Sequence, residues 1–188
     1  MDVIKMDEKK YSLPEMPNHW FDTFNQLAEY LNAPDNLLHE AIAVIYETID
    51  IFNKEFVSTF TVCQSGCSHC CHQNVSLTTI EAEYISYCTG IAIDKNSTSV
   101  KKPDATCIFL DQENKQCRIY NVRPFNCRSL HAIEDPSFCE KKETQLLYGH
   151  ARSGYNNVFY KNMYAYIVQQ NGTLPSRYLS DFFPKVSS

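Results

Sequence analysis

The chain has 188 residues, of which 44% are hydrophobic and 21% charged, and its formal net charge at pH 7 is −5. This size and composition are typical of one soluble globular domain with a sizeable core. The acidic balance argues against a nucleic-acid partner, because such proteins usually carry a basic surplus. No apolar run approaches the roughly 18 residues of a membrane span, so we expect no membrane association.

The first residues, MDVIKMDEKK, are too charged for a secretion signal, and we therefore expect a cytoplasmic protein. Proteins of this reducing compartment rarely hold structural disulfides. The chain nevertheless contains nine cysteines. Because this number is odd, full disulfide pairing would leave one cysteine over. These thiols indicate metal ligation or redox chemistry instead.

The predicted organisation is a lead-in over residues 1–17, followed by a single helical domain over residues 18–188. Apolar residues recur at three- and four-residue steps over residues 20–31, which is typical of an amphipathic helix. Pro34 breaks this pattern and suits the first turn of a second helix. A further apolar stripe runs through residues 38–56. Together the two stripes predict a helical hairpin with a buried inner face.

Every cysteine lies in the middle of the domain, and residues 60–139 are predicted to form a cysteine-rich insert. Within this insert, residues 76–90 predict a helix that begins at a capping box of Thr78 and Glu81 and ends at a glycine. Cys88 is expected to be buried on this helix as a small hydrophobe.

Two short apolar runs surround a polar turn in residues 107–120, and this pattern predicts a small β-hairpin. The helical signal returns from about Ser137 and is clearest over residues 155–171. Residues 174–184 predict a short closing helix. The predicted fold class is therefore mainly α, a helical scaffold with a cysteine-rich loop and a small β-hairpin insert.

The stretch CQSGCSHCCHQ has the cysteine spacing C-x3-C-x2-C-C, and three more cysteines follow on turn-rich sequence. Soft thiolates select zinc or iron–sulfur clusters, so the predicted cofactor is Zn²⁺ or a 4Fe-4S cluster. We hypothesise that the hairpin and the Arg-Pro segment after it fold over the first loop and complete the metal shell. The predicted ligands are Cys63, Cys67, Cys70, Cys71, Cys107, Cys117 and Cys127.

These seven thiols exceed the four that bind one zinc ion or one 4Fe-4S cluster. One of them is then a spectator, or the site is multinuclear, or two sites share the segment. Cys70 and Cys71 are adjacent, and neighbouring side chains usually diverge, so we do not expect both to bind one mononuclear ion. The sequence leaves open which of the two binds.

Charged and imidazole side chains flank the cysteines. A thiolate centre is anionic, and Arg123 and Arg128 are predicted to offset its charge, with Arg118 a weaker candidate. The alternative is that these arginines pair with surface carboxylates. His69 and His72 are predicted to be exposed or to donate hydrogen bonds to sulfur rather than to bind the metal.

The stretches CQSGCSHCC and CIFLDQENKQCRIYNVRPFNCR resemble the YkgJ-type cysteine-cluster family, a zinc- or iron-chelating domain with a CxxCxxCC signature. The resemblance covers roughly residues 60–130 and implies ligand roles for the same seven cysteines. Related clusters occur in flagellin lysine-N-methylases, where the similarity implies an iron–sulfur cluster. This chain departs from the family pattern in the longer spacing between Cys63 and Cys67, and in Ile108, where the family often has proline.

The primary hypothesis is a cytoplasmic protein whose iron–sulfur cluster or zinc ion has a structural or redox role. One alternative is an enzyme, or an enzyme subunit, related to protein lysine N-methylation. No glycine-rich nucleotide loop supports this alternative, and no catalytic residue is assigned. The other alternative is a zinc-stabilised module that binds an unidentified protein partner.

Overall fold

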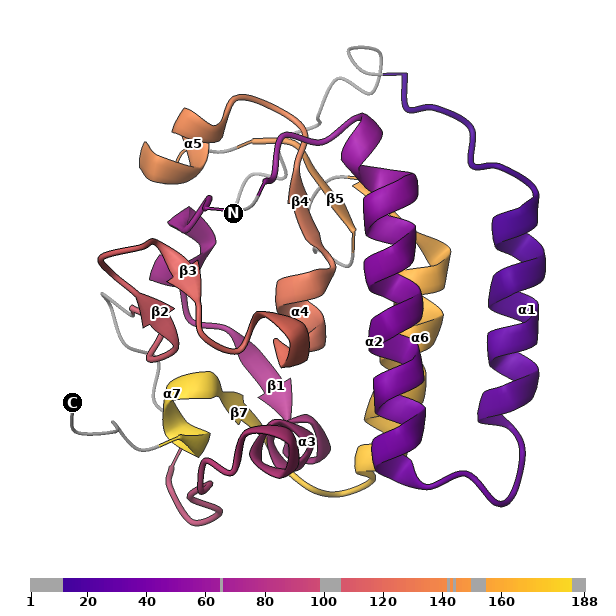
Figure 1. Ribbon diagram of the computed structural model, residues 1–188, viewed down its shortest axis with the longest axis vertical. Helices are drawn as coiled ribbons and strands as arrows, with labels where there is room; N and C mark the ends of the chain where they lie inside the picture. The colour runs from indigo at the N-terminus through magenta and orange to yellow at the C-terminus, as the bar shows by residue number, and fades with distance from the viewer. Residues whose placement is uncertain are drawn as a thin grey trace, which may run out of the picture.

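The computed structural model describes residues 12–64, 66–98, 106–141, 143, 145–149 and 155–183. Long helices occupy one side of the molecule, and short strands and turns occupy the other (Figure 1). Helix α2 contacts both α1 and α6 on the helical side. The helices are α1 (His19–Leu31), α2 (Leu38–Glu55), α3 (Thr79–Thr89), α4 (Phe125–Arg128), α5 (Pro136–Lys141), α6 (Val158–Asn171) and α7 (Leu179–Phe182), with the 3-10 turns η1 (Val57–Thr59), η2 (His69–His72) and η3 (Tyr120–Val122).

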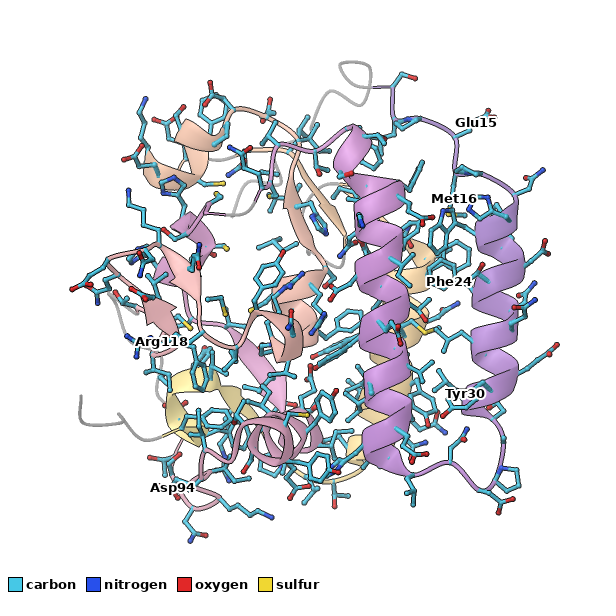
Figure 2. All side chains as sticks on the ribbon, viewed as in Figure 1. Glu15, Met16, Phe24, Tyr30, Asp94 and Arg118 are labelled. Carbon is cyan, nitrogen blue, oxygen red and sulfur yellow. The ribbon has the colours of Figure 1, made fainter. Side chains whose placement is uncertain are left out.

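The helical hairpin of α1 and α2 is confirmed, because the apolar stripe of each helix is buried. Phe24 points inward from α1 (Figure 2) and packs edge-on against Phe52 of α2, with 5.4 Å between ring centroids. The same ring stacks on Phe159 of α6 at 4.0 Å. The expected place of Pro34 in the first helical turn is wrong. It lies in the connecting turn, and α2 begins only at Leu38.

Helix α3 begins and ends at the predicted signals. The Thr78 side chain accepts a hydrogen bond from the Glu81 main-chain N–H, and the Glu81 carboxylate accepts one from the Thr78 N–H at 2.9 Å. Gly90 ends the helix with a φ of 72°, which favours glycine. Cys88 is exposed, so its expected burial is wrong. It lies in the last turn of α3, beside the exposed Tyr87.

Short paired strands connect the turns on the other side of the molecule. The predicted hairpin of β2 and β3 is confirmed, and β1 pairs with β7 in a second antiparallel pair. Strands β5 and β6 lie in the region from about Ser137 onward, where helix was expected, and they form a three-stranded sheet with β4. The helices α5 and α6 do form in that region. The strands are β1 (Ser76–Thr78), β2 (Leu110–Asp111), β3 (Gln116–Cys117), β4 (Leu130–Ala132), β5 (Leu147–Gly149), β6 (Tyr155–Asn156) and β7 (Ser176–Tyr178).

Two apolar cores hold these parts together. The first lies among α1, α2, α3 and α6 and also takes in Phe125 of α4 and Tyr148 of β5. The second joins the hairpin to the C-terminal turn through residues such as Phe109, Ile119 and Phe182. In the part of the chain that the structure describes, no helix combines the length and the hydropathy of a transmembrane span.

Candidate metal site

The first cysteine loop begins beside β4, to which it is hydrogen-bonded. Val62 donates its main-chain N–H to the Ala132 carbonyl at 2.9 Å, and the Ala132 N–H donates to Cys63 Sγ at 3.2 Å. Gly66 has a φ of 88°, a conformation that glycine adopts without strain, and so supports the tight turn toward Cys67. The chain then forms η2, which carries the paired cysteines and both histidines of the motif.

The second half of the motif folds against the first. Cys107 donates its main-chain N–H to the Cys71 carbonyl at 2.7 Å. In the hairpin, Cys117 pairs with Leu110, and Cys127 follows on the single turn of α4. The hypothesis that the hairpin closes over the first loop therefore agrees with the main-chain geometry.

Five thiols lie near enough for their charges to act on one another, and they form the hairpin group: Cys70, Cys71, Cys107, Cys117 and Cys127. Burial raises the pKa of Cys127, and the charges of Cys70, Cys107 and Cys117 raise it further. Burial likewise raises the pKa of Cys107 to about 11, with the charge of Cys117 acting in the same direction. These effects indicate that the five thiols lie in the same part of the molecule.

Cys70 and Cys71 do not diverge, contrary to the expectation for neighbouring side chains. The Cys71 thiol donates a hydrogen bond to the sulfur of Cys70, which lowers the pKa of Cys70 to about 7. The same hydrogen bond raises the pKa of Cys71. Because the two sulfurs already meet, adjacency in sequence does not prevent them from facing one centre.

A second group, the β4 group, contains Cys63, Cys67 and Cys139. Burial raises the pKa of Cys63 to about 11, and the charges of Cys67, Cys70 and Cys139 add to this effect. Cys139 lies on α5, which contacts η2, and its sulfur accepts a hydrogen bond from Gln145 Nε2 at 2.9 Å. Cys139 is not among the ligands predicted from the sequence, because its only signal there is its place at the end of the cysteine-rich region.

Main-chain amides already point at several of these sulfurs. Cys67, Cys107 and Cys117 each accept a hydrogen bond from the N–H of the residue two positions later, namely His69, Phe109 and Ile119. These N–H donors lower the pKa of each thiol, although burial is the larger effect and raises it. Such N–H···S bonds favour the thiolate, which is the form that binds metal.

The arginines occupy both of the roles that the sequence left open. Arg123 and Arg128 form ion pairs with Asp50 of α2. Arg123 also lies near the thiols, because its charge lowers the pKa of Cys70, Cys117 and Cys127 against the raising effect of burial on the latter two.

The remaining flanking side chains lie outside this network. Arg118 is exposed (Figure 2). His72 is also exposed, and its Nδ1 lies 3.3 Å from Thr106 Oγ1. His69 contributes its main-chain N–H to Cys67 Sγ, which places a hydrogen-bond donor at sulfur, as predicted, but from the backbone.

No closed coordination shell is present in the part of the chain that the structure describes. No group of three or more histidine, cysteine, aspartate or glutamate side chains there is set to hold a metal ion. The donor chemistry nevertheless fits zinc or iron, since all nine cysteines are free and the two groups together contain eight of them. Metal binding would then draw the sulfurs together, with the N–H donors already in place.

Comparison with known proteins identifies the same segment. Residues 62–148, just under half of the chain, match a family model described as "CxxCxxCC: Putative zinc- or iron-chelating domain". No curated protein and no solved structure shows significant similarity to the chain. The matched segment begins one residue before Cys63 and contains the hairpin group and the β4 group. The cysteine-rich region of this chain, residues 62–148, is therefore similar to the CxxCxxCC family.

Proposed function

We propose that the protein binds zinc, iron or an iron–sulfur cluster through the thiolates of the hairpin group and the β4 group, and that the bound centre has a structural or redox role. Under this proposal Cys139 joins the seven cysteines predicted from the sequence. The observation that carries the proposal is the hydrogen bond from the Cys107 N–H to the Cys71 carbonyl, at 2.7 Å, which joins the two halves of the cysteine motif.

A structural metal would stabilise this region by adding metal–sulfur bonds between segments that few other contacts hold together. The elements that carry the cysteines are single turns and two- or three-residue strands. Elements this short are marginal without tertiary contacts. A metal that joins η2, the hairpin and α4 would link segments that are far apart in the chain, and its binding free energy would then be partly folding free energy.

The nature of the centre can be established on the full chain. The protein is purified without oxygen, and its zinc, iron and sulfide contents are measured together with an absorption spectrum. A broad absorption band at about 400 nm with matching iron and sulfide indicates an iron–sulfur cluster. A colourless protein with stoichiometric zinc indicates a zinc–thiolate site.

Substitutions separate a metal site from unligated thiols. Cys67→Ser and Cys127→Ser should each lower bound metal and the melting temperature together. Cys88→Ser is the matched control, because Cys88 is exposed and belongs to neither group. Wild-type protein that holds no zinc or iron after anaerobic purification and reconstitution would refute the proposal.

A further inference from the structure

Helix α2 carries a row of polar side chains that contact the segment with Cys127. Tyr46, Asp50 and Asn53 follow one another at spacings of four and three residues, which places them along one face of the helix. The row contacts α4 and the turn before it. These residues precede residue 62, so they lie outside the segment that matches the metal-chelating family.

Asp50 binds both arginines of the Arg-Pro segment. Its Oδ1 accepts a hydrogen bond from Arg123 Nη2 at 3.1 Å, and its Oδ2 accepts one from Arg128 Nη1. The side chain of Arg128 is fully buried, and its Nε and Nη2 donate to main-chain carbonyls of Arg123 and Asn121. A buried guanidinium requires a carboxylate nearby, so Asp50 fixes the position of Arg128, the residue directly after Cys127.

Tyr46 acts on the same segment from two directions. The guanidinium carbon of Arg128 lies 4.1 Å from the centre of its ring. Its hydroxyl donates to the buried Glu81 carboxylate at 2.8 Å, and the same carboxylate oxygen accepts the Phe125 N–H at 2.8 Å. Asn53 completes the row, because its Nδ2 donates to the Arg128 carbonyl at 2.8 Å.

We propose that Tyr46, Asp50 and Asn53 are positioning residues for the metal site, which hold α4 so that Cys127 faces the other thiols of the hairpin group. The inference rests on the proposed metal-binding function. Cys127 lies between two anchored positions, the Phe125 N–H and the Arg128 side chain. Holding the backbone on both sides of a ligand reduces the freedom that the ligand must lose when metal binds.

The test compares zinc affinity, measured by competition with a chelator, in full-length variants. Asp50→Asn should weaken zinc binding by about 10- to 100-fold, the usual effect of removing a group that orients a metal ligand. Asp50→Glu, which retains the carboxylate, should recover most of the affinity. Glu83→Gln is the matched control. Glu83 lies on α3 and forms an ion pair with Lys95 at the surface. Loss of this ion pair should change the zinc affinity by less than about twofold.

A second readout does not need metal. In chelator-treated protein, the alkylation rate of Cys127, followed by peptide mass spectrometry, should rise in Asp50→Asn and stay unchanged in Glu83→Gln. If Asp50→Asn does not fold, Tyr46→Phe carries the test, because it removes only the hydroxyl that meets Glu81.

The outcomes separate the two proposals. Wild-type zinc affinity and wild-type Cys127 alkylation in both Asp50→Asn and Tyr46→Phe would overturn the positioning role. An equal fall in melting temperature of the metal-free and zinc-loaded forms, without a change in affinity, would also overturn it and leave a purely structural network. Wild-type protein that binds no metal would instead overturn the proposed function.

Discussion

The main-chain N–H of Cys107 donates to the carbonyl of Cys71 at 2.7 Å. This hydrogen bond joins η2 to the approach of the hairpin, so the two halves of the cysteine motif meet through their backbones as well as through their thiols. A ligand on one half is therefore not independent of a ligand on the other. Substitutions at either half should disturb the same centre.

Cys139 provides the most direct test of the β4 group. We expect Cys139→Ser to lower bound zinc or iron, because its charge acts on Cys63 and Cys67 and α5 contacts η2. The measurement is metal content per chain after reconstitution. Cys88→Ser, which replaces an exposed cysteine outside both groups, is the control. Equal metal content in the two variants would remove Cys139 from the site.

Metal affinity should rise with pH. Burial holds the pKa of Cys63 and of Cys107 at about 11, so both thiols are protonated at neutral pH when no metal is bound. Metal binding must then release their protons. Chelator competition between pH 6 and pH 8 should show tighter binding as the pH increases, and a weakly buffered solution should acidify when zinc is added. Binding that is independent of pH would contradict ligation by these thiols.

The half-buried His131 should make the metal-free protein sensitive to acid. Burial lowers the pKa of His131 to about 4, whereas an unfolded histidine titrates near 6.5. The unfolded chain therefore binds the extra proton first. The free energy of unfolding should fall as the pH drops from about 6.5 to about 4, by about 3 kcal/mol in total.

Urea unfolding at several pH values, with a chelator present, measures this effect. His131→Gln should flatten the dependence over this range, because glutamine has no proton to gain. His72→Gln, at an exposed position, should leave the dependence unchanged. If His131→Gln retains the full acid dependence, other groups are responsible for it.

Gly149 allows no side chain. A Cβ built at this position would lie 1.8 Å from the Ser129 carbonyl oxygen, and its φ of 133° is strained for other residues. Gly149 of β5 pairs with Leu130 of β4, and β4 is the strand whose Ala132 N–H donates to Cys63 Sγ. Gly149→Ala should cost several kcal/mol of stability, roughly 2 to 5. Thermal melting measures it, with Gly172→Ala as the comparison, since nothing lies within 4 Å of a Cβ there.

Local signals in the sequence were sufficient for the long elements. The capping box of Thr78 and Glu81 and the glycine at position 90 predict the ends of α3, because each acts within one helical turn. The strands of the β4–β6 sheet were not predicted. Each has only two or three residues, which is too short for an alternating pattern to appear. Their pairing depends on partners distant in the chain.

The same distinction applies to the site. Spacing alone predicted ligands in the first loop and the hairpin, and family resemblance implied the same residues. Cys139 has no close cysteine neighbour in sequence, and only the packing of α5 against η2 brings it to Cys63 and Cys67. Asp50 and Arg128 are likewise far apart in the chain. An isolated acidic residue on a helix carries no sequence signal for such a partner.

The apolar core that contains Phe125 and Tyr148 has a consequence for how the protein can be divided. Both residues belong to the segment that matches the chelating family, yet they pack into the same cluster as Phe52 of α2 and Tyr160 of α6. A fragment cut at residues 62 and 148 would leave these aromatic rings without their partners. We therefore expect residues 62–148 and the flanking helices to melt as one cooperative unit. The segment that matches the family model would then not fold on its own.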